Sequence, residues 1–142
     1  MPIKSPKQKG SSGEYEIIAL LTGWAAEVEV SLDLSRNLEQ VRAGGADING
    51  VPGLEVEVKR VENGSINQWW KQVCKAADKS GKTPSLFHRK NRQPWRARVR
   101  TTVAMHNEES GVWDLFAVDA DLELAQAKLW FQKHVQVFGE RC

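Results

Sequence analysis

GADINGVPGLEVEVKR, residues 45–60, decides the fold of this 142-residue chain, because it holds a strand pattern and the turn that leads into it. From residue 54 onward apolar and charged side chains alternate, and successive side chains of a strand point to opposite faces. One face therefore holds Leu54, Val56 and Val58, and the other holds Glu55, Glu57 and Lys59. The apolar face packs on a core, whereas the charged face is either solvated or a functional site.

The turn-forming segment NGVPG, residues 49–53, predicts a hairpin that brings Asp47 opposite residues 55–57. Carboxylates held this close destabilise each other unless a positive charge binds between them. A hard divalent cation such as Mg²⁺ or Mn²⁺ supplies that charge and keeps several waters for chemistry. Lys59 shares the strand face of Glu57, where its ammonium group is placed to hold a water or to neutralise charge in a transition state.

The segment SSGEYEIIALLTGW, residues 11–24, predicts the first helix, with Ser11 and Glu14 spaced as a capping box. Glu14 also shares the buried stripe of Ile17, Ile18 and Leu21 by its spacing. A carboxylate on a buried face needs a partner. Two interpretations stay open: Glu14 reaches back to the backbone N–H of Ser11, or it joins the acidic cluster. The acidic hairpin favours the second.

Length and composition predict one globular domain over residues 11–142, preceded by a flexible basic arm over residues 1–10. No apolar run approaches the roughly 20 residues that span a bilayer, and the first ten residues lack the apolar segment of a secretory signal. Cys74 and Cys142 form no ligand cluster, which favours a reducing compartment and a cytoplasmic location, the host cytoplasm if the protein is encoded by a phage. No phosphate-loop motif is present, so no nucleotide cofactor is expected.

The basic residues are unevenly distributed, because residues 79–107 carry eight basic and no acidic side chains. This asymmetry favours an anionic partner over the alternative of a solubilising surface. Arginines alternate along one face of the strand predicted at 95–105, where they either contact phosphates or protect an exposed sheet edge. The candidate phosphate contacts in this region are Arg89, Lys90, Arg92, Arg96, Arg98 and Arg100.

Several apolar groups also allow two interpretations. Trp69 and Trp70 can stack on unpaired bases, although their place on or beside a helix stripe favours core packing. The last helix has a broad apolar face that covers the core or pairs with a second subunit; its residues are Leu122, Leu129, Trp130 and Phe131.

The predicted elements follow the order αβββαβββα, an α/β fold with a mixed sheet flanked by helices. Besides the first helix and the hairpin, the expected elements are a strand at 26–34, a helix at 65–81, strands at 84–89, 95–105 and 112–118, and a closing helix at 119–136 with acids in its first turn.

Asp47 followed by Glu57-Val58-Lys59 resembles the D…(D/E)XK signature of the PD-(D/E)XK nuclease superfamily. The segment KGSSGEYEI, with Lys9, Gly10 and Glu14, resembles the opening helix of archaeal Holliday junction resolvases and of small phage proteins similar to them. The resemblance covers roughly residues 9–100. It implies a restriction-endonuclease-like core and Mg²⁺-dependent hydrolysis of DNA phosphodiesters, in branched DNA such as Holliday junctions, by a homodimer.

The resemblance also implies residue roles. Asp47 and Glu57 would bind the metal with the Val58 carbonyl, Lys59 would be the catalytic lysine, and Glu14 would complete the cluster directly or through a metal-bound water. With the basic residues above, Lys9, Arg36 and Arg42 are the remaining candidate DNA contacts.

One departure bears on the substrate. The resolvases carry a catalytic serine in the loop before the aspartate, and here that loop offers Ser35, Arg36 and Arg42 but no serine close to Asp47. A nuclease for flaps, single strands or duplex DNA and a non-catalytic DNA-binding module therefore remain alternatives. Retention of all four polar positions, Glu14, Asp47, Glu57 and Lys59, argues against a decayed site.

Overall fold

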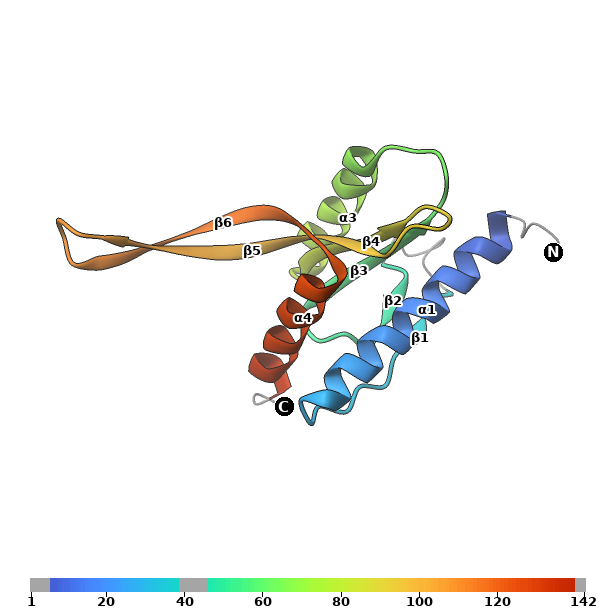
Figure 1. Ribbon diagram of the computed structural model, residues 1–142, viewed down its shortest axis with the longest axis horizontal. Helices are drawn as coiled ribbons and strands as arrows, with labels where there is room; N and C mark the ends of the chain where they lie inside the picture. The colour runs from blue at the N-terminus through green and yellow to red at the C-terminus, as the bar shows by residue number, and fades with distance from the viewer. Residues whose placement is uncertain (1–5, 39–45, 140–142) are drawn as a thin grey trace.

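A computed structural model describes residues 6–38 and 46–139, and the side chains from Ser12 onward within these ranges. Figure 1 shows one sheet with helices on both faces. The elements are α1 (Pro6–Glu27), β1 (Ser35–Arg36), β2 (Ile48–Asn49), β3 (Leu54–Arg60), α3 (Ile66–Ser80), β4 (Thr83–Arg89), β5 (Arg96–Asn107), β6 (Val112–Leu122) and α4 (Leu124–Gly139). The α/β class is confirmed. The order of the described elements reads αβββαβββα, but its first strand is β1 and not the strand predicted at 26–34.

The sheet has the strand order β1-β2-β3-β4-β5-β6, and it is mixed as predicted because β3 and β4 are parallel while the other neighbours are antiparallel. A parallel pair needs a crossover, and α3 supplies it. Both ends of α3 are capped: the Ser65 hydroxyl accepts the Gln68 N–H at 3.3 Å, and Gly81 takes the left-handed conformation at φ 75°.

Two apolar layers hold the helices against the sheet. α1 and α4 cover the face that carries Leu54, Val56 and Val58, as the strand alternation predicts, and α3 covers the other face around Leu86. The layer under α1 and α4 is the larger of the two. It forms the main core of the domain.

The second half of α4 contacts two other parts of the fold. Gln132 donates to the backbone carbonyl of Trp24 in α1 at 3.1 Å, and the rings of Phe131 and Trp24 lie 6.2 Å apart. Further along, a ring nitrogen of His134 lies 2.6 Å from the carbonyl oxygen of Pro52, in the turn between β2 and β3. α4 therefore supports both α1 and this turn.

β5 and β6 extend beyond the rest of the sheet as a two-stranded arm, which we define as residues 101–118 (Figure 1). β4 pairs only with residues 96–99 of β5, so β6 is the only strand paired with β5 along the arm in the described part of the chain. The large apolar side chains exposed on the arm are Met105, Val112, Trp113, Leu115 and Phe116.

The structure corrects three boundaries. The first helix begins at Pro6, so the predicted flexible arm is already helical from residue 6, and Ser11 is not its N-cap. The strand predicted at 26–34 is wrong: its apolar residues pack against the core, but the backbone of 28–34 pairs with no strand in the described sheet. The closing helix begins at Leu124 rather than at residue 119, because Asp119 and Asp121 belong to β6.

None of the helices in the described ranges combines the length and the apolar character needed to cross a bilayer.

Candidate active site

The β2–β3 hairpin brings Asp47 and Glu57 together. Ile48 pairs with Val56, so the two residues just outside this pair lie next to each other, as the hairpin prediction requires. Asp47 is buried, and its carboxylate accepts the backbone N–H of Val58 at 2.7 Å. Its own N–H donates to the Val56 carbonyl at 2.9 Å. Backbone hydrogen bonds therefore hold the Asp47 carboxylate against the strand that carries Glu57.

Burial raises the pKa of Glu57 to about 8, and the neighbouring Asp47 carboxylate contributes to this rise through its charge and a hydrogen bond. Lys59, whose ammonium nitrogen lies 3.6 Å from a Glu57 carboxylate oxygen, opposes this shift. The three side chains thus form a compact cluster in which one carboxyl keeps its proton at neutral pH. Such perturbed groups are typical of functional sites.

Glu55, the third charged residue of this strand face, is structural. Its side chain is buried, and a carboxylate oxygen accepts the backbone N–H of Ala46 at 3.1 Å. Asn37 holds the same segment from the other side, since its side-chain amide donates to the Ala46 carbonyl at 2.8 Å and its backbone N–H to the Asp47 carbonyl at 2.7 Å. These bonds fix the backbone on which Asp47 stands.

Glu14 reaches the same site from α1. Burial raises its pKa, a hydrogen bond from the Arg36 guanidinium opposes that rise, and the Asp47 charge adds to it. Because the helix begins at Pro6, Glu14 lies within it and is not a capping residue. Its closest partner is Arg36, with which it forms an ion pair. Arg36, predicted to contact DNA, is therefore placed as the counter-ion of Glu14.

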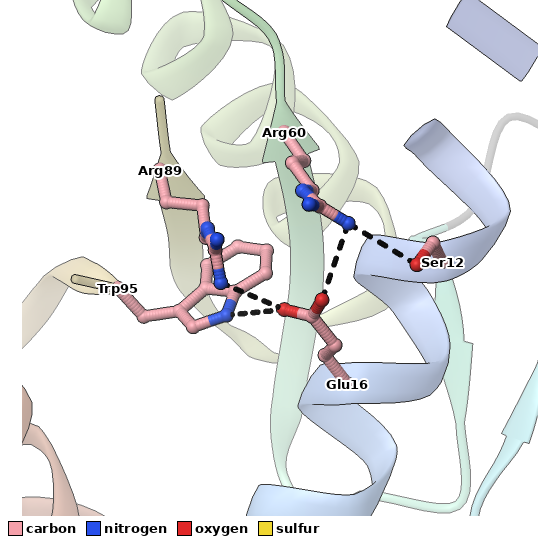
Figure 2. Close-up of polar contacts among 5 residues, drawn as sticks. All are labelled: Ser12, Glu16, Arg60, Arg89 and Trp95. Carbon is pink, nitrogen blue, oxygen red and sulfur yellow. Dashed lines mark hydrogen bonds and ion pairs between the residues drawn. The ribbon is translucent and has the colours of Figure 1, made fainter. Parts of the chain in front are cut away.

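A second carboxylate of α1, Glu16, fastens the helix to the sheet (Figure 2). One of its oxygens accepts from Arg60 at 3.2 Å, and the other accepts from Arg89 at 3.1 Å and from the Trp95 indole at 2.8 Å. Arg60 also donates to the Ser12 hydroxyl at 3.1 Å. These contacts join α1 to β3, to β4 and to the turn before β5.

Gly13, one residue before Glu14, permits this close approach. A Cβ at this position would lie 3.1 Å from the Arg60 Cβ and 3.4 Å from the Trp95 ring. A larger residue would push the helix away from the sheet. Glu14 is therefore positioned by a close contact on one side and by the Glu16 network further along the helix.

The candidate DNA contacts are not all available as free cations. Arg98 and Arg100 are paired with Asp121 and Asp119 of β6, at 2.7 and 2.9 Å. These aspartates, which the sequence assigns to the closing helix, therefore take the place that phosphates were predicted to fill. Lys90, Arg92 and Arg96 are exposed, and no ion pair within the described residues engages them. Arg42 and the Lys9 side chain lie outside the described parts.

The donor set fits a hard divalent cation that keeps part of its water shell. Within the described ranges, no group of three or more His, Cys, Asp or Glu side chains is arranged to hold a metal ion. Two close carboxylates, with the proton retained on Glu57, form the part of the cluster that a cation would neutralise. Glu14 is paired with Arg36.

Sequence comparison places the chain in a family. Residues 5–129 match the family model described as "Phage putative PDDEXK endonuclease". The chain belongs to this family. The matched range includes Glu14, Asp47, Glu57 and Lys59, so the clustered residues of this PDDEXK endonuclease lie within the part that defines the family. None of the curated proteins matches the chain.

Among solved structures, the PDDEXK endonuclease is similar to Hjc of Archaeoglobus fulgidus, a Holliday junction resolvase from an archaeal hyperthermophile. The sequences are 19% identical, the TM-score is 0.48, and the match covers 84% of this chain and 95% of that one.

Sequence reasoning missed the roles of Arg36, Asn37 and Glu16. Each acts through a partner that no local pattern identifies, as Arg36 does with Glu14 22 residues away and Glu16 with Arg89 73 residues away. Sequence reasoning did find Asp47 and Glu57, because only a short turn separates them along the chain.

Proposed function

We propose that this PDDEXK endonuclease is metal-dependent and cuts branched DNA such as Holliday junctions, as a homodimer. One observation carries the proposal: Asp47, Glu57 and Lys59 lie together, close enough to Glu14 to influence its charge. The chain also belongs to an endonuclease family. An isolated, solvated charged face would not raise the pKa of Glu57 to about 8.

Asp47, Glu57 and the Val58 carbonyl are the groups proposed to hold the ion, Mg²⁺ or Mn²⁺. When bound, the ion would activate water and offset charge on the phosphate. Lys59 sits beside Glu57, where its ammonium orients a water or stabilises negative charge on the reacting phosphate. Glu14 is proposed to accept a hydrogen bond from a water of that shell, and Arg36 holds its carboxylate in place.

The preference for branched DNA comes from the resemblance of the KGSSGEYEI helix and the Asp47…Glu57-Val58-Lys59 signature to junction resolvases. The absence of a serine close to Asp47 in the sequence keeps flaps, single strands and duplex DNA as the rival substrates. The exposed cations Lys90, Arg92 and Arg96 are the proposed phosphate contacts. A cytoplasmic location stays a prediction.

The arm supports the homodimer. A two-stranded ribbon with apolar side chains on exposed surface is poorly suited to stand alone in water. Residues 101–118 include three acidic and no Lys or Arg side chains, so the charge of the arm does not favour contact with DNA. We propose that each arm packs against a second copy of the chain.

Asp47→Asn tests the catalytic assignment. The amide oxygen can still accept the Val58 N–H, so the fold should persist while metal binding is lost. We expect cleavage of a labelled four-way junction in Mg²⁺ to fall by on the order of a thousandfold, with DNA binding retained. Undiminished cleavage would refute the site, and EDTA should abolish cutting by the wild-type protein.

The substrate is tested by comparing four-way junction, flap, duplex and single-stranded DNA with the wild-type protein in Mg²⁺. We expect the junction to be cut fastest. Equal cutting of all four would refute the preference for branched DNA but leave the nuclease assignment intact. DNA binding with no Mg²⁺-dependent cleavage would favour the non-catalytic DNA-binding module.

A further inference from the structure

We propose that a pocket beside the active site binds an unpaired nucleotide of the DNA substrate, with its base stacked on Trp69. The pocket has a volume of about 350 Å³ and lies between the loop after β3, the start of α3 and the end of β4. The inference rests on the proposed function, because it names the part of the substrate that the protein holds next to the scissile phosphate.

The sheet register places the pocket next to Lys59. Lys59 of β3 pairs with His88 of β4, and His88 lines the pocket. Residues paired across adjacent strands share a face, so the pocket opens on the same face of the sheet as Glu57 and Lys59, one strand away. A DNA strand bound at the active site can therefore continue into the pocket.

Trp69 forms the aromatic wall. Unlike its neighbour Trp70, which is buried in the core under α3, Trp69 is only partly buried and lines the pocket. Gly64 braces the indole: its φ is 142°, and a Cβ there would lie 2.3 Å from the Trp69 ring. A ring held in one orientation loses little freedom when a base stacks on it.

Polar groups complete a site of the kind that nucleotides require. Asn67 accepts a hydrogen bond from Arg98 at 2.9 Å through its side-chain oxygen, and within the described residues its amide N–H₂ has no acceptor. Lys90, at the rim, is exposed and available to a phosphate. No Asp or Glu side chain is among the described residues that line the pocket. Aromatic, amide and cationic groups together match a base and its phosphate.

Fully paired DNA would have to extrude a base to use this pocket, whereas a single strand or a branch point presents bases that are already unstacked. The pocket therefore favours DNA with unpaired bases. This is a property of binding, and it can be measured without cleavage.

The test uses the full-length Asp47→Asn protein in EDTA, with fluorescence anisotropy of a labelled oligothymidylate and of a paired duplex of equal length. Trp69→Leu keeps an apolar side chain against the cluster of Trp70, Val73 and Leu86 but removes the stacking ring. We expect it to weaken oligothymidylate binding about tenfold and to leave duplex binding unchanged. Trp69→Phe, the matched control that keeps an aromatic ring at this position, should retain binding of both DNAs.

Gly64→Ala provides a second variant that keeps Trp69. Its Cβ would overlap the ring and alanine is strained at a φ of 142°, so both the loop and the ring shift; it should reproduce the selective loss if Trp69→Leu fails to fold. Unchanged oligothymidylate binding by these variants, or an equal loss of duplex binding, would refute the proposal that the pocket binds an unpaired nucleotide. Wild-type cleavage of the junction in Mg²⁺ is scored separately, so the nuclease proposal and the pocket can fail independently.

Discussion

The protonation state of Glu57 sets the charge of the candidate site before any ion binds. Its carboxyl is pushed towards the protonated form by burial and by Asp47, so the metal-free cluster avoids holding two adjacent negative charges. A divalent ion would have to displace this proton to bind. The proposed metal site would thus exchange a proton for the ion.

In the metal-free protein, we expect the free energy of unfolding to fall as pH rises from about 4.5 to about 8. The unfolded chain releases the Glu57 proton near its ordinary pKa of 4.5, whereas the folded protein keeps it until about 8, so the folded state binds more protons across this window. Each pKa unit corresponds to about 1.4 kcal/mol. Urea titrations in EDTA should show this decline for wild-type protein and not for Glu57→Gln; parallel profiles would contradict the prediction.

Arg36→Gln should lower the free energy of unfolding at pH 7 by about 1–3 kcal/mol, because it leaves the buried Glu14 carboxylate without its cation. The matched control is Lys128→Gln, which removes a cation from the exposed pair with Glu27 and should cost less than about 1 kcal/mol. Urea denaturation measures both variants. Equal small losses would mean that Arg36 does not stabilise Glu14.

The hairpin residues of the site were predictable because their proximity follows from local rules: the alternation in β3 and a short turn set the Asp47–Glu57 contact. The Glu14–Arg36 pair was not, since no local pattern connects a helix residue to a strand that follows a non-repetitive segment. Arg98 and Arg100 show the same limit, because their partners become visible only with the register of β5 and β6.

Among whole elements, α1 is the one whose position determines the site. It carries Glu14, and the Glu16 network fixes it to the sheet (Figure 2). The Nε atoms of Arg60 and Arg89 are buried, and neither has a hydrogen-bond acceptor in the described structure. Glu16 is therefore the group that compensates these two guanidinium charges.

Glu16→Ala should lower the free energy of unfolding by about 1–3 kcal/mol, since two part-buried guanidinium groups would no longer share an acceptor. It should also raise hydrogen exchange in α1 relative to α3, because the hydrogen bonds of Glu16 tie α1 to the sheet. Hydrogen–deuterium exchange by mass spectrometry resolves the two helices. A uniform increase in both would argue against a specific role in holding α1.

The elements that the sequence predicted well carry local signals, as α3 does with Ser65 and Gly81 at its ends. The strand prediction for residues 26–34 failed because an alternating apolar pattern alone does not make a strand. The apolar side chains pack on the core, but the backbone has no neighbouring strand in the described sheet; these residues are Val28, Val30, Leu32 and Leu34. The acids before α4 were misassigned because Asp119 and Asp121 fit a helix start as well as a strand paired with arginines.

At the scale of the whole molecule, the arm extends away from the rest of the fold and exposes large apolar side chains (Figure 1). Leu115 is 69% exposed and Trp113 60% exposed on it. Burying such side chains between two copies would also set two active sites at a fixed separation, as coordinated cuts in a branched substrate require.

Leu115→Lys should weaken self-association at least about tenfold, because it places a charge in the proposed interface. Leu38→Lys, at a leucine that is 75% exposed and lies outside the arm, is the matched control and should leave association unchanged. Sedimentation velocity across a concentration series measures both. A wild-type protein that stays monomeric at every concentration would refute the dimer.

The contacts of α4 have a practical consequence for anyone who shortens this protein. The family match stops at residue 129, yet the buried side chains Phe131 and Val135 lie beyond it, and so do the residues that contact Trp24 and Pro52. One contact backs the helix that carries Glu14, and the other backs the bend between Asp47 and Glu57. Truncation at the family boundary would thus remove the packing that supports every acidic group of the proposed nuclease centre, while the sequence signature stayed intact.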